Sequence, residues 1–340
     1  MARFLHTKQL PGLERGTWRR LVLFCCAMAG FIYFLKAQLH QRAAGEKPFV
    51  TYLSTASGKK VDPLINVTSW GAPIVWGDRE ESQLRRMEFA DKGVTTGLAV
   101  FVIGKYSHYL QKFIVSAERY FLEGQAVTYY ILTDNLRGIP NLSLRTGRKL
   151  KALYIAERPE WVHLSRTRMS LLSSSIKEFI KNEVDYLFCM DVDQVFINRV
   201  GAEILGDLVA TFHPVYFNRP HYTFPYETTL DSKAYVEDSE GDYYYTSELY
   251  GGLCSEIYEL ALLCSQFIIQ DMEMSYHAFL FEESYLNRFF INKRPSRILS
   301  PEYSWWDAPE TSNIQVKRIL SLQRGCFQDS ESKGANCYST

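Results

Sequence analysis

The chain contains 340 residues, 46% of them hydrophobic and 14% aromatic, which is enough to form a full core in one large domain or two small ones. Its 38 basic residues balance its 38 acidic residues, so the formal net charge is zero. This balance argues against a nucleic-acid-binding surface, because phosphate recognition would need a basic excess.

An apolar segment close to the N-terminus indicates a membrane context. Residues 21–35 carry no charge, with arginines before them and Lys36 after them. As a helix this run would cover about 22 Å of a hydrocarbon core of about 30 Å, and interfacial side chains can close part of the gap. The basic flank predicts a type II orientation, with residues 1–20 as a cytoplasmic tail, 21–36 as an uncleaved signal anchor and the rest lumenal. A cleavable signal peptide and a buried helix are the competing interpretations.

Residues 37–68 are polar, mixed in charge and without sustained apolar periodicity, which predicts a stem. Two glycosylation sequons, which begin at Asn66 and Asn141, are usable only in a lumenal compartment. We favour Asn66 as the glycosylated residue, because its sequon lies in a stretch that we expect to be flexible.

Five cysteines lie beyond the apolar segment, and their spacing shows no metal-binding pattern. Cys189 lies inside an apolar run and is expected to be a small buried hydrophobe. In an oxidising lumen a disulfide could join Cys254 to Cys264, or Cys326 to Cys337, and the sequence leaves both pairings open.

Strand-like and helix-like segments alternate between residues 97 and 190. Short apolar runs are typical of interior strands, and the segments between them repeat apolar residues at helical spacing. This alternation predicts an α/β fold with a parallel-dominated sheet and crossover helices. The expected strands are 97–103, 127–132, 151–155 and 185–190, and the expected helices are 106–121 and 169–182.

Two carboxylates one residue apart, Asp191 and Asp193, directly follow the last of these strands. They would emerge at its carboxyl end, where open α/β sheets place their ligands. Hard oxygen donors on a tight turn suit Mn²⁺ or Mg²⁺, and such a cation can hold a diphosphate. The alternative is an ordinary turn at a strand end, since Asp is common in turns.

The second half of the chain holds two further candidates for chemistry. Residues 241–252 combine a tyrosine cluster with the pair Gly251-Gly252, and composition alone favours an aromatic strand followed by a turn over a ligand-binding role. Glu282 and Glu283 precede an apolar stretch with helical spacing. Acidic residues in a first helical turn usually just stabilise the helix dipole, and on their own they favour that interpretation.

Several ordered motifs together resemble glycosyltransferase family six, the group that contains the histo-blood-group A and B transferases, α-1,3-galactosyltransferase and the isogloboside and Forssman synthases. The similarity covers residues 69–325, and the spacing from Asp191 to Glu283 has no gap. The motifs are Trp70–Trp76, Val100–Tyr106, Tyr186–Phe196, Gly241–Tyr245, Gly251–Gly252, Glu283–Phe290, Asn292–Pro295 and Leu299–Tyr303.

The resemblance implies a GT-A type catalytic domain over residues 69–325, with a mixed, mostly parallel sheet flanked by helices, and a C-terminal tail over 326–340. It also implies a single-pass Golgi membrane protein. The expected reaction is Mn²⁺-dependent, retaining transfer of galactose or N-acetylgalactosamine from the UDP-sugar. The expected acceptor is a terminal galactose-type residue on a glycolipid or glycoprotein, joined in α-1,3 linkage.

The functional residues of the family carry over onto individual positions of this chain. Glu283 falls at the position of the nucleophile, or of the stabiliser of an oxocarbenium-like centre, and the sequence does not choose between these roles. Asp191 and Asp193 would hold Mn²⁺, and Arg168 falls where a guanidinium meets the donor. The expected donor-binding set is Phe101, Val102, Ile103, Tyr106, Arg168, Asp191, Val192 and Asp193.

The chain departs from the family pattern at sugar-binding positions. In the triplet 246–248, Glu248 is larger and charged where the family has small residues, so the triplet does not decide between galactose and N-acetylgalactosamine. Leu280 stands in place of a tryptophan that could stack on an acceptor sugar, which predicts altered acceptor recognition. These departures support a second hypothesis, a catalytically weakened family member that acts as a lumenal glycan-binding or partner-binding protein. The expected substrate-binding set is Tyr216, Thr246, Ser247, Glu248, Glu282, Glu283 and Arg324.

Overall fold

The structure is a computed structural model that describes residues 66–322, except for 78–79, 91, 156–160 and 307–310. The predicted cytoplasmic tail and signal anchor, most of the predicted stem, and Arg324 lie outside the described residues. In the described part of the chain, no helix is both long enough and apolar enough to cross a membrane.

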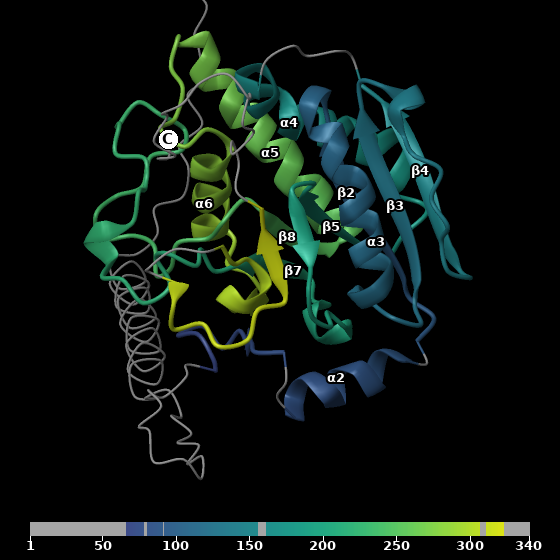
Figure 1. Cartoon of the computed structure of the whole chain (residues 1–340). Coiled ribbons are helices and arrows are strands. Elements are labelled where there is room, and N and C mark those ends of the chain that lie inside the picture. Colours follow the sequence, from purple (N-terminus) through teal and green to yellow (C-terminus); the bar gives the residue numbers. More distant parts are fainter. Residues whose placement is uncertain (1–65, 78–79, 91, 156–160, 307–310, 323–340) are drawn as a thin grey trace, which may run out of the picture. The chain divides into compact units, whose positions relative to one another are not determined.

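A mixed sheet lies at the centre of the described domain (Figure 1). Its strands are β1 (Ile74–Val75), β2 (Thr95–Val102), β3 (Ala126–Thr133), β4 (Arg148–Tyr154), β5 (Tyr186–Asp191), β7 (Leu208–Thr211), β8 (Leu249–Leu253) and β9 (Arg297–Leu299). Among the described residues their order is β1-β9-β7-β8-β5-β2-β3-β4. Neighbouring strands are parallel except at β8, which is antiparallel to both β5 and β7. The predicted mixed, mostly parallel α/β fold is confirmed.

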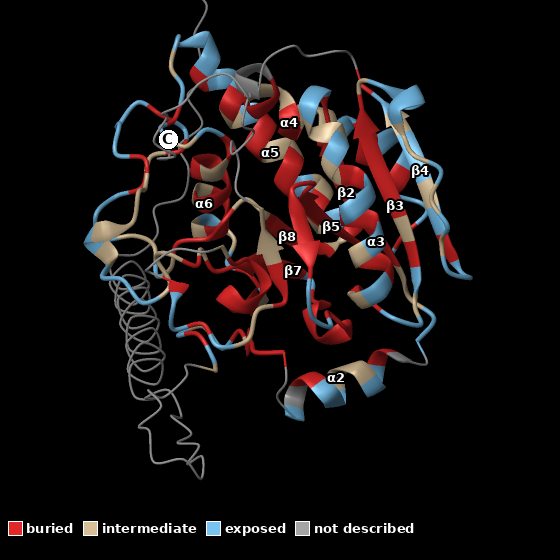
Figure 2. Ribbon diagram, viewed as in Figure 1, coloured by how far each residue is buried: buried red, intermediate tan, exposed pale blue. Residues whose placement is uncertain are grey.

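Helices cover both faces of this sheet (Figure 1). Alternate side chains of strand β2 pack into the two hydrophobic cores on opposite faces of the sheet. Leu98 and Val100 pack on one face with α3, whereas Ala99 and Phe101 pack on the other with α4 and α5. Buried residues accordingly line the central strands and the inner sides of these helices, whereas the edge strand β4 is mostly exposed or intermediate (Figure 2). The helices are α2 (Glu80–Ala90), α3 (Leu110–Tyr120), α4 (Trp161–Ser175), α5 (Cys254–Glu273) and α6 (Glu282–Asn292).

Both predicted helices exist, with irregular turns that the apolar spacing did not reveal. The first begins as a 3₁₀ helix, Gly104–Tyr109, before it continues as α3. The second starts earlier than expected, at Trp161, and α4 ends in a π-helical turn over Ile176–Ile180. The other short helices are Leu136–Gly138, Ala202–Ile204, His221–Thr223 and Pro301–Tyr303, and a separate antiparallel pair joins β6 (Gln194–Phe196) to β10 (Ile319–Ser321).

The glycine pair lies inside a strand of the sheet, so the predicted turn at this point is wrong. Gly251 and Gly252 are central residues of β8, opposite Phe188 and Leu187 of β5. A Cβ atom on Gly251 would overlap the ring of Phe188, and one on Gly252 would overlap the backbone carbonyl of Asp207. The glycines are therefore required by close packing between strands, which residue composition cannot distinguish from a turn.

Gly251→Ala is expected to lower the free energy of unfolding by roughly 1–3 kcal/mol, because the added methyl group displaces a fully buried aromatic ring. Denaturant titration measures the loss. In a Phe188→Leu background the same substitution should cost clearly less, since the overlapping ring is gone. Equal costs in the two backgrounds would contradict the packing explanation.

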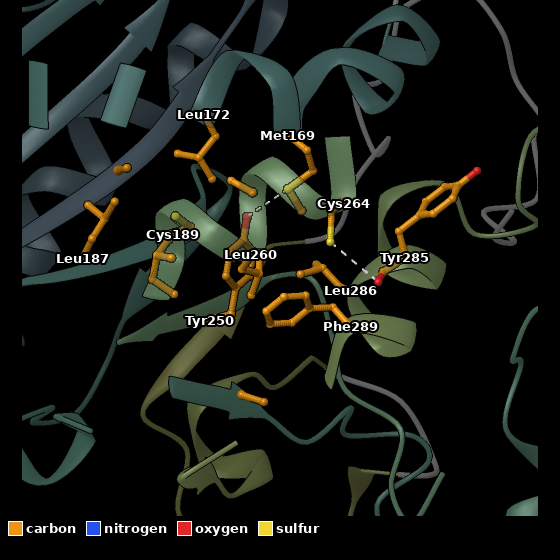
Figure 3. Close-up of a cluster of buried hydrophobic side chains, with 14 of the residues drawn as sticks. Met169, Leu172, Leu187, Cys189, Tyr250, Leu260, Cys264, Tyr285, Leu286 and Phe289 are labelled. Atoms are coloured by element: carbon orange, nitrogen blue, oxygen red, sulfur yellow. Dashed lines mark hydrogen bonds between the residues drawn. The ribbon is translucent and has the colours of Figure 1, made fainter. Parts of the chain in front are cut away.

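Three cysteines are buried as free thiols in or beside the core between the sheet and α5, and Figure 3 labels two of them, Cys189 and Cys264. Cys189 is a small buried hydrophobe of β5, as predicted. Cys254 and Cys264 are not bridged, which corrects one of the two disulfide pairings left open, and the thiol of Cys264 instead donates to the carbonyl of Tyr285 at 3.6 Å. Burial raises the pKa of the Cys254 thiol to about 11, which makes it unreactive at neutral pH. Cys326 and Cys337 lie outside the described residues.

The sequon at Asn66 belongs to the folded domain, although its position predicts flexible stem. The carbonyl of Asn66 accepts a hydrogen bond from Ile74 N at 2.8 Å, and Val67 forms a β-bridge with Pro73. The hydroxyl of Thr68 accepts from Ala72 N at 2.9 Å and is buried. Residues 66–68 therefore pack with the described domain, and both the extent of the stem and the glycosylation of Asn66 stay predictions.

Candidate active site

An open hollow lies where β2 and β5 end next to each other. Phe101 pairs in register with Asp191, so the parallel strands deliver an aromatic ring and a carboxylate to the same edge of the sheet. The empty space, including its solvent-filled mouth, is about 300 Å³. This size is at the lower end for small-molecule sites. The lining residues are Phe101, Ile103, Tyr106, Leu164, Arg168, Asp191, Val192 and Asp193.

Arg168 of α4 is a buried cation at the base of this hollow. Its Nη1 lies 2.8 Å from Asp191 Oδ1 and 2.8 Å from Glu282 Oε1, and its guanidinium lies over the ring of Phe101 at 5.1 Å. Burial alone lowers the pKa of Arg168, but the charges of Glu282 and Asp191 outweigh burial and the net pKa is raised. One permanent positive charge therefore links the end of β5 to the start of α6.

The turn after β5 presents Asp191, Val192 and Asp193 to the hollow. Its backbone is held at both ends, because Asp191 N donates to the carbonyl of Glu248 at 3.2 Å and Leu322 N donates to the carbonyl of Asp193 at 2.9 Å. The two carboxylates that the sequence singled out are thus brought to one site, on a turn with little freedom.

The donor chemistry of this turn fits a divalent cation that shares its coordination with a substrate. Within residues 66–322, as far as they are described, no group of three or more His, Cys, Asp or Glu side chains converges into a closed metal site. Mg²⁺-type cations are commonly held by one or two carboxylates together with water and phosphate oxygens, and Mn²⁺ accepts the same oxygen donors. Asp191 and Asp193 therefore fit a cation that arrives with a diphosphate.

Glu283 lies beside the hollow, with its carboxylate held by three donors. Its Oε1 accepts from the hydroxyl of Tyr244 at 2.9 Å, and its Oε2 accepts from Ser247 N at 2.8 Å and Ser247 Oγ at 3.0 Å. Burial raises the pKa of Glu283, these hydrogen bonds lower it in part, and the charge of Asp191 raises it further, so the net pKa is raised. The carboxylate is oriented and carries its charge in a poorly solvated position.

The first turn of α6 sends two consecutive glutamates to different partners. Successive helical residues point about 100° apart, so Glu282 reaches Arg168 while Glu283 reaches Tyr244 and Ser247. Phe281, just before the helix, has φ 49° and ψ −128°, which is a strained conformation for a residue with a side chain. An interaction with the helix dipole does not explain these contacts, because each carboxylate binds residues from other segments of the site.

An aromatic wall, formed by His213, Tyr216, Tyr244 and Trp306, adjoins Glu283. The His213 ring packs against Tyr216 at 4.6 Å, Trp306 at 5.2 Å and Tyr244 at 5.6 Å. Burial lowers the pKa of His213 to about 3, so the ring is neutral at physiological pH. Sequence reasoning assigned no role to His213, Tyr244 or Trp306, although His213 follows the end of β7 and Tyr244 belongs to the tyrosine cluster.

Comparison with known proteins agrees with this arrangement. The model of the family described as glycosyltransferase family 6 matches residues 47–327, which is most of the chain. The chain belongs to glycosyltransferase family 6. It is a hexosyltransferase of this family, as its curated relatives are.

The relatives cover several named activities. The chain is 42% identical to the chicken globoside α-1,3-N-acetylgalactosaminyltransferase 1 over 78% of each chain. It is 37% identical to the rat histo-blood group ABO system transferase 1, over 70% of this chain and 68% of the relative. It is 29% identical to the human α-1,3-galactosyltransferase 2, over 93% of this chain and 96% of the relative.

The site residues that the family resemblance implies do not all lie in one place. Seven of the eight predicted donor residues line the hollow, whereas the side chain of the eighth, Val102, packs into the core on the α3 side of the sheet. Tyr216 and Ser247 adjoin Glu283. Thr246 is buried, and its hydroxyl accepts from Glu248 N at 3.2 Å. The carboxylate of Glu248 contacts residues of other segments, described below. Arg324 lies outside the described residues.

Tyr244→Phe is expected to move the acidic limb of the kcat profile to higher pH. The substitution keeps the ring but removes the hydroxyl that donates to Glu283, so the pKa of Glu283 rises further and its charged form is lost at a higher pH. Steady-state kinetics across pH measure the shift. Tyr226→Phe is the matched control, since its hydroxyl donates to the carbonyl of Tyr243 in the same aromatic cluster and makes no contact with Glu283. An unshifted acidic limb in Tyr244→Phe would show that this hydrogen bond does not tune the group whose ionisation sets that limb.

Proposed function

We propose that this family 6 enzyme transfers N-acetylgalactosamine or galactose from its UDP derivative, with retention of configuration, onto a terminal galactose-type residue of a glycolipid or glycoprotein in α-1,3 linkage. One observation carries the proposal. Arg168 joins Asp191 of the metal-binding turn to Glu282, so the diphosphate end of a donor and the carboxylate of Glu283 belong to one connected site. Such a site brings leaving group and reacting carbon together.

Different residues of the hollow would bind different parts of the donor. The apolar and aromatic side chains of Phe101, Ile103 and Tyr106 suit the uracil and ribose. Asp191 and Asp193 would hold Mn²⁺, which when bound neutralises the charge of the departing diphosphate. The guanidinium of Arg168, which stays protonated, adds a fixed positive charge beneath the donor.

Glu283 supplies the negative charge that the sugar centre needs as the bond to the diphosphate breaks. In a covalent route it attacks the anomeric carbon, and in a front-face route it stabilises an oxocarbenium-like centre. Both routes need an ionised and oriented carboxylate. The hydrogen bonds from Tyr244 and Ser247 hold the carboxylate in one orientation, and they favour its charged form against the effect of burial.

The names of the relatives favour N-acetylgalactosamine as the first donor to test. Four relatives named as globoside α-1,3-N-acetylgalactosaminyltransferase 1 are 39–42% identical to the chain, whereas the human α-1,3-galactosyltransferase 2 is 29% identical. We extend the proposal to a type II Golgi membrane protein with a lumenal catalytic domain, supported by the basic flank and apolar run of residues 15–36.

The proposal is tested with the purified full chain, UDP-N-acetylgalactosamine or UDP-galactose, and a panel of terminal-galactose acceptors. The expected product carries an α-anomeric sugar on the 3-hydroxyl, which NMR of the product identifies, and its formation should require Mn²⁺. Binding of UDP and of glycans without any turnover would instead support the second hypothesis, a glycan-binding lumenal protein.

Asp193→Asn is expected to weaken Mn²⁺-dependent UDP binding by about a hundredfold or more, because it removes one of the two carboxylate charges offered to the cation. Calorimetric titration of UDP with and without Mn²⁺ measures the loss. Asp207→Asn, at the start of β7 and away from the hollow, is the matched control and should bind normally. Unchanged Mn²⁺-dependent binding in Asp193→Asn would contradict the assignment of this carboxylate.

A further inference from the structure

The carboxylate of Glu248 lies at a junction of three chain segments. Its Oε2 accepts a hydrogen bond from Ser304 Oγ at 2.7 Å, from Ser321 Oγ at 2.6 Å and from Gln194 Nε2 at 3.3 Å. Gln194 directly follows Asp193, Ser304 follows the 3₁₀ helix at 301–303, and Ser321 is the last residue of β10. One side chain therefore connects the metal-binding turn to two segments from the end of the domain.

The same junction holds the backbone of the metal-binding turn. In the antiparallel pair β6–β10, Ser321 is the register partner of Gln194, and Gln194 Nε2 also donates to Ser321 Oγ at 3.2 Å. The next residue, Leu322, donates its N–H to the carbonyl of Asp193. The position of Asp193 is thus supported by β10, and β10 is in turn held by Glu248.

We infer that Glu248 is a positioning residue: it anchors β10 and Ser304 to the metal-binding turn, and it acts on donor binding through Asp193 instead of selecting the donor sugar. The inference rests on the proposed function for its kinetic consequence only. Two hydroxyl donors at 2.6 and 2.7 Å are typical of charge-assisted hydrogen bonds, which are stronger than neutral ones. A small residue at this position has no carboxylate and could not form the junction.

The strand that Glu248 anchors is short, which makes a side-chain anchor effective. Strand β10 has three residues, pairs with the three-residue β6, and is bridged on its other side at Trp305. Backbone pairing over so few residues is marginal. Without the carboxylate, the bond from Leu322 N to Asp193 should open more often, and the cation would have to order a looser turn when it binds.

Hydrogen exchange of the Leu322 amide in the full chain tests this inference directly. Glu248→Ala should accelerate this exchange by about tenfold or more, and Glu248→Gln should fall between Ala and the natural residue because it keeps an acceptor oxygen but not the charge. Asn198→Ala is the matched control, since the exposed Asn198 donates to the carbonyl of Lys317 and so joins the same two segments away from Glu248. An unchanged Leu322 exchange rate in Glu248→Ala would overturn the inference.

A double-mutant cycle tests the partner assignment with a milder substitution. Ser321→Ala removes a single hydroxyl from a partly exposed residue and should also accelerate Leu322 exchange. The double variant Glu248→Ala, Ser321→Ala should exchange more slowly than the sum of the two single effects, because both substitutions remove the Glu248–Ser321 hydrogen bond, although Ser321→Ala also removes the acceptor of Gln194 Nε2. Additive acceleration would overturn the anchoring role of this pair.

Binding measurements separate anchoring from sugar selection. In Glu248→Ala the apparent Kd for Mn²⁺, measured through UDP binding, should rise by about tenfold, while the ratio of kcat/KM for UDP-N-acetylgalactosamine to that for UDP-galactose should stay constant. A changed donor ratio with normal Leu322 exchange would show that Glu248 contacts the sugar instead. The exchange experiment needs no turnover, so its result can be interpreted even if the proposed transfer reaction is not observed.

Discussion

Glu283→Gln is expected to lower kcat by about a thousandfold or more while UDP and Mn²⁺ still bind. Glutamine keeps the size of the side chain and one acceptor oxygen, so it can still accept from Tyr244 or Ser247, but it cannot carry the negative charge that the sugar centre requires. Removal of a group that acts only in the transition state lowers kcat with little effect on ground-state binding. Rapid-quench or steady-state kinetics with the preferred UDP-sugar, together with UDP titration, measure both quantities.

Glu259→Gln provides the control for this prediction. Glu259 lies on α5, where it pairs with Lys293 on the surface, so its loss changes the net charge by the same amount and leaves the site intact. Nearly normal kcat in Glu283→Gln would exclude Glu283 from the reaction. An alternative carboxylate is then Glu282, although its ion pair with Arg168 gives it a binding role rather than a reactive one.

Arg168→Met is expected to lower the free energy of unfolding by about 3–5 kcal/mol and to weaken UDP binding in the same variant. The arginine compensates Asp191 and Glu282, which are both buried, and removal of one partner leaves uncompensated buried charge. The loss of stability should become smaller as pH falls. Without the arginine, burial disfavours the charged forms of these two carboxylates, so proton uptake by the folded state restores stability at acidic pH. Thermal or denaturant unfolding across pH measures both effects.

Arg145→Met is the matched control for the buried ion pairs. Arg145 pairs with Glu123 at 3.3 Å on the surface, and exposed pairs of this kind contribute 0–1 kcal/mol as a rule of thumb, about the limit of detection. A stability loss in Arg168→Met no larger than in Arg145→Met would mean that the Asp191 and Glu282 carboxylates are protonated in the folded protein, and the charge arrangement proposed for the site would then be wrong.

The elements that carry the site were predictable because their signals are local. Residues 186–190 form a continuous apolar run, which is typical of a strand that is buried on both faces, and this strand places Asp191 at the sheet edge. The alternation of strands and helices along the chain likewise predicted the parallel part of the sheet. The motif spacing through Glu283 then indicated the family, which the family model confirms.

The features that the sequence left open or placed wrongly share a different cause, because each depended on which distant residues come into contact. Gly251 was read as part of a turn, whereas the ring of Phe188 from a neighbouring strand explains the glycine. Cys254 and Cys264 are ten residues apart in sequence, and helix α5 buries both without joining them. Neither contact leaves a trace in local composition.

The sequence by itself determined the α/β alternation and the family, because apolar periodicity and motif spacing are properties of short segments, and it singled out the carboxylates for which we propose a role. Only the tertiary structure decided how those carboxylates are charged and held. Arg168 joins Asp191 to Glu282, Tyr244 and Ser247 hold Glu283, and Glu248 binds residues of β10. These partners lie far apart along the chain, and their energies depend on burial and on distances of a few ångströms that only the folded sheet and its helices establish.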